Sequence, residues 1–213
     1  MVLMYDYVID CGRVDEDSLV GSSIREVINW AVNGVIGGER VLAIMGEPGS
    51  GKTTALLAIM GRLRRLGIPV AYLNAYNELG LRPVKLINCR NDRGARVLLI
   101  DDLDAVFTVP RMAQGLVGRV LGFNGTVIAA LTMPLLVGNE LELLEPLIIL
   151  LHSAPRMVIE YRDEELRVLA QRIGIDYVGP EVRTPGMVLR NFRKLGSNGS
   201  TMRNVLNDAD VVL

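Results

Sequence analysis

One stretch of the chain decides its fold: Gly46-Glu47-Pro48-Gly49-Ser50-Gly51-Lys52-Thr53. It has the spacing Gly-x-x-x-x-Gly-Lys-Thr, and an apolar run, Arg40 to Met45, comes directly before it. The segment that follows, Thr53 to Leu66, keeps an apolar face and ends at Gly67, as helices commonly do. This order predicts a buried strand, a glycine-rich turn and a helix.

The predicted turn is a P-loop, a backbone cradle for phosphate groups. Its glycines let successive N–H groups point at the α- and β-phosphates of a nucleotide, and the helix that begins at Thr53 adds the positive end of its dipole. Lys52 is expected to meet the β- and γ-phosphates, and the Thr53 hydroxyl is expected to ligate Mg²⁺. The expected nucleotide-binding residues are Gly46, Glu47, Pro48, Gly49, Ser50, Gly51, Lys52, Thr53 and Thr54.

A second motif, Val97 to Asp102, supplies carboxylates. It reads Val-Leu-Leu-Ile-Asp-Asp, an apolar strand that ends in two acids, and a P-loop needs an acid at the end of a neighbouring strand. In this Walker B interpretation, Asp101 holds Mg²⁺ through the waters of the ion, and Asp102 orients and polarises the attacking water. The alternative, that the acids merely end a strand, stays open above all for Asp102, because many such enzymes place the longer Glu there.

The pattern of the whole chain predicts an α/β fold. Apolar, β-branched runs recur with helix-like stretches between them, as in a parallel sheet with crossover helices. Five strands are expected: Arg40 to Met45, Val70 to Asn74, Arg96 to Asp101, Gly125 to Thr132 and Arg156 to Tyr161. Helical segments are expected at Ser18 to Ala31, Thr53 to Leu66, Leu79 to Asn91, Arg111 to Leu121, Asp163 to Ile173 and Pro185 to Leu195. We expect a three-layer P-loop core over residues 1–161, then a short helical lid and tail over 162–213, flexible from Gly196 on.

Composition narrows the class of protein. Half of the residues are apolar, but no apolar stretch reaches the roughly 18 clean residues of a membrane span. The segment from Met1 to Asp17 lacks the features of a signal peptide, so we expect a cytoplasmic protein. Cys11 and Cys89 are far apart and form no metal-binding pattern, so we expect both to be reduced. The single histidine, His152, leaves Ser–His–Asp chemistry unsupported.

The order of these motifs resembles that of the AAA+ ATPases over nearly the whole chain. Thr126 to Thr132 is similar to the strand that ends in the sensor 1 residue, which implies that Thr132 contacts the γ-phosphate or the water; the alternative is a buried threonine at a strand end. Pro155 to Tyr161 resembles the last core strand of initiator and clamp-loader proteins, which implies that Arg156 acts on a neighbouring subunit's nucleotide. The pair Asp101-Asp102 also resembles the paired aspartates of bacterial replication initiators and helicase loaders.

The two ends of the predicted core show one further likeness and two departures from the family pattern. Leu19-Val20-Gly21, followed by Ile24, is similar to the stretch that lines the adenine pocket. The lid is short and its sensor 2 arginine is not cleanly placed; Arg190 is the candidate, against a plain surface role. No winged-helix domain follows, so full origin-binding initiator function is not expected.

The resemblance implies a Mg²⁺-dependent ATPase that forms homo- or hetero-oligomers with ATP and acts as a switch or loader on DNA or a replication complex. The segment 61–96 holds eight basic and two acidic residues in a chain of net charge −1. This is typical of a surface that binds the phosphates of a nucleic acid, or of an ordinary solvated face. The alternatives are a protein-remodelling or signalling AAA+ module without nucleic acid, and a small-molecule kinase. The sequence motifs of GTPases and of transporter ATPases are absent, which favours ATP.

Overall fold

The computed structural model describes residues 7–12, 14, 16, 19–82, 84–132, 141–174, 179 and 181–196. At its centre lies a parallel five-stranded sheet in the order β3-β5-β6-β2-β7. Its strands are β2 (Val41–Gly46), β3 (Val70–Asn74), β5 (Val97–Asp101), β6 (Thr126–Thr132) and β7 (Arg156–Val158). All five predicted strands are therefore confirmed, and β6 separates the strand of the P-loop from the strand of the two acids.

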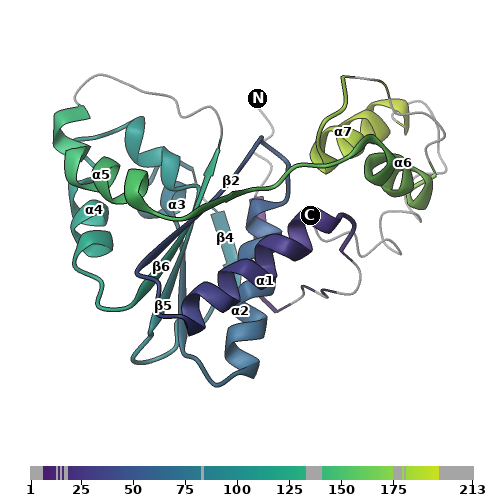
Figure 1. Cartoon of the computed structure of the whole chain (residues 1–213). Coiled ribbons are helices and arrows are strands. Elements are labelled where there is room, and N and C mark those ends of the chain that lie inside the picture. The colour runs from purple at the N-terminus through teal and green to yellow at the C-terminus, as the bar shows by residue number, and fades with distance from the viewer. Residues whose placement is uncertain are drawn as a thin grey trace.

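Helices cover both faces of this sheet (Figure 1). One face carries α1 (Ser22–Ile36) and α2 (Lys52–Arg65). The other face carries α3 (Ala75–Glu78), the 3-10 helices η2 (Leu103–Phe107) and η3 (Leu141–Leu144), α4 (Gln114–Leu121) and α5 (Glu145–Ser153). Because side chains alternate along a strand, Leu42 and Ile44 of β2 enter the first core while Val41 and Ala43 enter the second. The predicted three-layer α/β fold is confirmed.

Two helices follow the core, as the sequence predicts. They are α6 (Asp163–Arg172) and α7 (Pro185–Gly196), which lie together beside the carboxyl end of the sheet (Figure 1). Leu166 and Leu169 of α6 pack with Val188 of α7 in a small core of their own. Tyr161 joins this core and the core beneath α1. Of the tail that is expected to be flexible, Gly196 ends α7 and the remainder lies outside the described residues.

The expectation of a helical segment at Leu79 to Asn91 is wrong. The chain instead forms β4 (Val84–Ile87), which pairs in parallel with β1 (Tyr7–Asp10) in a separate two-stranded sheet. Gly80, at φ +65°, follows the end of α3, and Asn88, at φ +58°, follows the end of β4. Seven residues, 81–87, lie between these two breaks, and the last four of them form a strand because β1 offers them a partner.

The expectation that both cysteines are reduced is also wrong, because Cys11 and Cys89 form a disulfide with their Cα atoms 4.9 Å apart. Cys11 directly follows β1, and Cys89 lies just beyond β4. The register pairs Asp10 with Ile87, so the parallel pairing carries the two cysteines into reach of each other. Their 78-residue separation in sequence therefore says nothing about their distance in the fold.

Replacing both cysteines by serine should lower the free energy of unfolding by about 2–4 kcal/mol, because the disulfide closes a long loop and so restricts the unfolded chain. The melting temperature should fall by roughly 5–15 °C. Thermal unfolding of the oxidised wild type, the reduced wild type and the double variant checks this. Equal melting temperatures for the three samples would contradict a disulfide in solution.

Of the helices in the described residues, none combines the length and the apolar character needed to cross a membrane.

Candidate nucleotide-binding site

The P-loop lies between β2 and α2, where the sequence predicts it. Gly46 ends β2, and Gly51 is the N-cap of α2 with φ +90°. Gly49 also has a positive φ, +79°. Residues that carry a Cβ atom rarely adopt a positive φ. Both positions therefore favour glycine. The loop therefore turns sharply and leads into the N-terminus of α2. The N–H groups at a helix N-terminus bind anions.

Lys52 lies inside this loop rather than in solvent. Its side chain is buried, and Nζ donates hydrogen bonds to the carbonyl oxygens of Gly46, at 3.0 Å, and Glu47, at 3.1 Å. Burial lowers the pKa of Lys52, and the charges of nearby aspartates oppose this shift. The loop thus holds an ammonium group among backbone carbonyls, close to several carboxylates.

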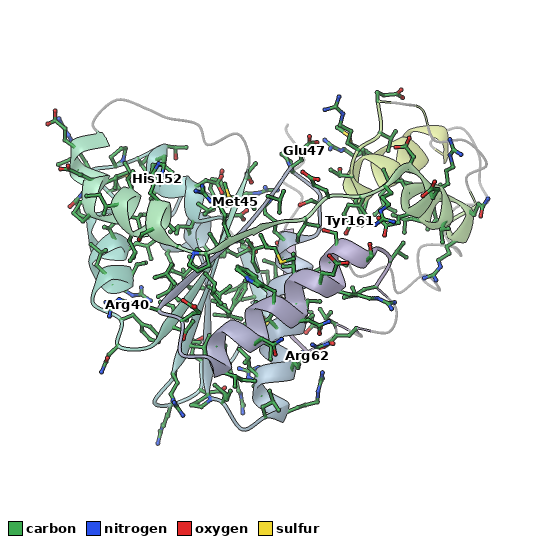
Figure 2. All side chains as sticks on the ribbon, in the orientation of Figure 1. Arg40, Met45, Glu47, Arg62, His152 and Tyr161 are labelled. Atoms are coloured by element: carbon green, nitrogen blue, oxygen red, sulfur yellow. A yellow bond between two sulfur atoms is a disulfide. The ribbon has the colours of Figure 1, made fainter. Side chains whose placement is uncertain are left out.

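The next three carbonyl groups of the loop accept hydrogen bonds from residues that follow β7 in the chain. Thr184 Oγ1 donates to Pro48 O at 3.3 Å, and the Gly186 N–H donates to Gly49 O at 3.0 Å. The Tyr161 hydroxyl donates to Ser50 O at 3.1 Å. All five consecutive carbonyls, 46–50, therefore have a protein donor. Figure 2 shows Tyr161 between the sheet and the α6–α7 pair, and Glu47 near the tip of the loop.

The start of α7 touches the P-loop directly. A methyl group on Gly186 would lie 2.8 Å from the Gly49 Cα, so only glycine fits at this contact. Arg183, on the segment that enters α7, has Nη1 4.0 Å from Glu47 Oε1. The exposed Arg190 lies one turn along α7, where Nε donates to Gly186 O at 3.3 Å. Arg190 is thus on the side of α7 that meets the loop, and its sensor 2 role stays a prediction.

The stretch compared with an adenine pocket also lies at the loop. Gly21 has φ +111°, and a methyl group there would lie 2.6 Å from Cε1 of Tyr161. A methyl group on Gly51 would lie 3.2 Å from Ile24 Cδ1. The beginning of α1, the end of the P-loop and Tyr161 are therefore in contact.

The first acid of the pair meets the P-loop threonine. Thr53 Oγ1 donates to Asp101 Oδ2 at 2.8 Å, and the Tyr72 hydroxyl donates to the same oxygen at 2.9 Å. Asp101 is fully buried at the end of β5. Burial raises its pKa, as does the charge of Asp102, while the hydrogen bonds from Thr53 and Tyr72 lower it. The structure thus brings together the two residues that the sequence assigns to a metal ion.

The second acid, Asp102, has its carboxylate oriented by β3. Its φ of +52° is in the left-handed region, which is uncommon for residues other than glycine. The buried Asn74 donates from Nδ2 to Asp102 Oδ2 at 2.9 Å, and its own Oδ1 accepts from the Asn77 N–H at the start of α3. Sequence reasoning missed Asn74. The signal that could have found it is a polar residue at the end of an apolar strand, Val70–Asn74.

A third carboxylate, Asp104, holds the end of β6. Its Oδ1 accepts from the Thr132 N–H at 3.1 Å, and burial raises the pKa of Asp104. Thr132 pairs in register with Gly46, so the last residue of β6 lies beside the first residue of the P-loop. This is the position that the sensor 1 prediction for Thr132 requires, although its contact with a nucleotide stays a prediction.

Arg156 lies elsewhere on the sheet. It is the exposed first residue of β7 and pairs with Ala43, three residues before Gly46 on β2. At about 3.3 Å per residue, this is roughly 10 Å back along the sheet from the P-loop. Arg156 is therefore not brought to the P-loop of its own chain, and its action on a neighbouring subunit stays a prediction.

The residues present fit a Mg²⁺–triphosphate group. Mg²⁺ prefers oxygen ligands and is usually held by one or two protein side chains together with waters and phosphates. Thr53 and Asp101 offer such oxygens, whereas the described residues contain no cluster of three or more His, Cys, Asp or Glu that would form an all-protein cage. The buried hydroxyls of Ser50 and Thr54 have no hydrogen-bond partner among the described residues. Such groups can be satisfied by a ligand or by water.

Comparison with solved structures finds proteins of the same fold. A DNA replication initiation factor is 18% identical, with a TM-score of 0.58 over 84% of this chain and 63% of that one. The replication initiator DnaA bound to AMPPCP and single-stranded DNA is 17% identical, with a TM-score of 0.57 over 86% and 64%. AMPPCP-bound DnaA from Aquifex aeolicus is 17% identical, with a TM-score of 0.57 over 91% and 67%. At this identity the likeness shows the fold alone.

The chain spans less than two thirds of the length of the first two of these proteins. No curated protein sequence matches it significantly. A family match covers residues 42–153, more than half of the chain, from β2 through α5. The matched region contains the P-loop, both acids and Thr132. The chain therefore belongs to the ATPase family associated with various cellular activities (AAA).

Proposed function

We propose that this protein binds Mg²⁺–ATP at the P-loop and hydrolyses it, as a nucleotide-controlled switch or loader that acts on DNA or a replication or recombination complex. The observation that carries the first part is the hydrogen bond from Thr53 to the buried Asp101. It joins the P-loop to the Walker B strand beside Lys52 and Asp102.

Each of these residues has a distinct task in the proposal. Lys52 offsets the charge of the β- and γ-phosphates, and Thr53 and Asp101 hold the metal ion, Asp101 through its waters. When bound, Mg²⁺ supplies Lewis-acid polarisation of the phosphate oxygens. Asp102, kept in place by Asn74, accepts a proton from the attacking water and orients it. Thr132 contacts the γ-phosphate or that water from the end of β6.

The lid, from residue 162 on, closes the proposed site. Support comes from the hydrogen bonds of Thr184 and Gly186 to the P-loop carbonyls, which link the start of α7 to the loop. Arg190 then adds a positive charge on the same side of α7. Nucleotide binding and lid position are therefore coupled in this proposal, as a switch requires.

DNA is the proposed partner, through the basic segment 61–96. The DnaA of one similar structure is bound to single-stranded DNA. Within the segment, Arg62 and Arg65 pair with Glu16, and Arg64 pairs with Asp92, which reduces the charge available to phosphates. The segment also contains five exposed basic residues, Arg82, Lys85, Arg90, Arg93 and Arg96. These ion pairs favour a second candidate, a protein-remodelling or signalling module whose partner is another protein.

Asp102→Asn should keep Mg²⁺–ATP binding but lower ATP turnover by roughly 10²–10⁴-fold, because the amide cannot accept a proton. Asp101→Asn should instead raise the Mg²⁺ concentration needed for binding. Phosphate release and ATP titration, each over a range of Mg²⁺ concentrations, measure both effects. Near-normal turnover in both variants would contradict the proposed roles of the acids.

The phosphate-release assay also tests whether DNA is the partner of this protein. Turnover of the wild type is measured at low salt with single-stranded DNA, with double-stranded DNA and without either. A variant in which Arg82, Lys85 and Arg90 are all replaced by glutamate should have unchanged turnover without DNA. It should lose any stimulation of turnover by DNA. No stimulation and no DNA binding by the wild type would favour the protein-partner candidate.

A further inference from the structure

Tyr72 places a polar group deep in the core beside the proposed metal site. It lies on the edge strand β3 and is 2% exposed. Its ring belongs to the core beneath α1 and α2, whose other buried side chains are mostly aliphatic. Its hydroxyl lies 2.9 Å from Asp101 Oδ2. A buried phenol hydroxyl costs free energy unless it finds a partner, and here the partner is the buried carboxylate.

The hydrogen bonds on Asp101 come from three different parts of the fold. Oδ2 accepts from Thr53 of α2 and from Tyr72 of β3. Oδ1 accepts from the N–H of Asp102, the next residue of the same chain segment. A threonine hydroxyl has one proton and two acceptor lone pairs, so donating to Asp101 leaves the oxygen of Thr53 able to ligate a cation. The Tyr72 hydroxyl donates to the same oxygen of Asp101 from the sheet strand β3.

We propose that Tyr72 is a positioning residue for the metal site, which sets the rotamer of Asp101 through its hydroxyl. This inference rests on the proposed Mg²⁺–ATP function. Thr53 belongs to α2, the helix that follows the P-loop, whereas Tyr72 belongs to the sheet. The bond from Tyr72 therefore keeps the Asp101 carboxylate directed at the metal position independently of the P-loop.

The position of Tyr72 on β3 supports this role. β3 pairs with β5 so that Asn74 lies opposite Asp101 and Tyr72 lies opposite Leu99. Residues two apart share a face of a strand, and Tyr72 and Asn74 donate to the two successive acids. One edge strand therefore orients both carboxylates. If this side chain only filled the core, phenylalanine would serve as well as tyrosine.

Tyr72→Phe in the full chain removes that oxygen and little else. A hydrogen bond to a charged group is strong, so its loss should raise the Mg²⁺ concentration for half-maximal ATP binding by roughly tenfold or more. ATP binding measured in EDTA should stay unchanged, because Tyr72 acts only through the metal site. Titration calorimetry with ATP at a series of MgCl₂ concentrations measures both quantities, and thermal unfolding reports the fold.

Tyr76→Phe is the matched control, because Tyr76 is a half-buried tyrosine in α3, the helix that directly follows β3, and donates no hydrogen bond to Asp101. It should leave the Mg²⁺ requirement unchanged. In an Asp101→Asn background, Tyr72→Phe should add almost nothing, since its effect passes through the carboxylate. This second comparison separates positioning from a general loosening of the core, which would add its effect in either background.

The outcomes distinguish this inference from the function on which it rests. A wild type that does not bind ATP with Mg²⁺ would overturn both. A wild type that binds, with an unchanged Mg²⁺ requirement in Tyr72→Phe, would overturn the role of Tyr72 alone. Equal losses with Mg²⁺ and in EDTA would also overturn it, because they would mean a structural effect on the whole site.

Discussion

Lys52→Ala should weaken ATP binding by at least roughly 10²–10³-fold, the usual consequence of removing one partner of a buried, hydrogen-bonded charge pair. In the proposed complex, the ammonium group offsets the β- and γ-phosphates. It also donates to the carbonyl oxygens of Gly46 and Glu47. Alanine therefore removes two hydrogen bonds within the loop as well as the charge. Titration with ATP and Mg²⁺ measures the loss.

The fold should survive this substitution, because the strand and the helix that flank the loop are anchored by their own cores. Lys85→Ala is the matched control: Lys85 is an exposed lysine on β4, in the separate two-stranded sheet, and its loss should leave ATP affinity unchanged. Circular dichroism and thermal unfolding check both variants. Unchanged ATP affinity in Lys52→Ala would mean that the P-loop assignment is wrong.

Arg156→Ala should lower ATP turnover by about 10³–10⁵-fold while ATP affinity stays near that of the wild type. The expected cause is the loss of a guanidinium that stabilises the charge on the transferred phosphoryl group of a neighbouring subunit. The structure argues against an action of Arg156 on the nucleotide of its own subunit. Arg156 lies on the strand next to β2 and pairs with Ala43, three residues before the P-loop. Turnover per subunit of the wild type should accordingly rise with protein concentration.

The competing role for Arg156 is a surface ion pair, for example with Glu160, worth about 0–1 kcal/mol. Within the described residues, Arg156 makes no ion pair. Arg167→Ala, an exposed arginine on α6, is the control for loss of a surface charge.

A mixing experiment decides between the two roles. Arg156→Ala subunits can still bind ATP, and Lys52→Ala subunits can still lend Arg156. Restored turnover in the mixture would support a site shared between subunits. A wild type that is monomeric with ATP and equally active at every concentration would exclude a shared site.

The sequence predicted those features that depend on neighbouring residues. The P-loop, the apolar strands and the two acids are short local patterns, and the burial of β2, β5 and β6 follows from unbroken apolar runs. The lid helices α6 and α7 also appear within a residue or two of their predicted bounds. Local turn geometry and helix periodicity suffice for these, because each depends on contacts within a few residues.

Prediction failed where a short segment could adopt more than one structure. Residues 84–87 became strand β4 because β1, some eighty residues earlier, offers it a partner. The same pairing brings Cys11 to Cys89. No local pattern contains this information, since a strand this short is stable only once its partner is in place.

The sequence by itself determined the chemistry of the site: a lysine and a threonine after a glycine-rich turn, and two carboxylates at the end of a buried strand. Only the tertiary structure decided how these groups are held. Tyr72 and Asn74 reach the acids because β3 pairs with β5, and Thr184 and Gly186 reach the P-loop because α7 packs against it. The physical reason is that hydrogen bonds between distant segments depend on strand order and packing, which no spacing along the chain specifies.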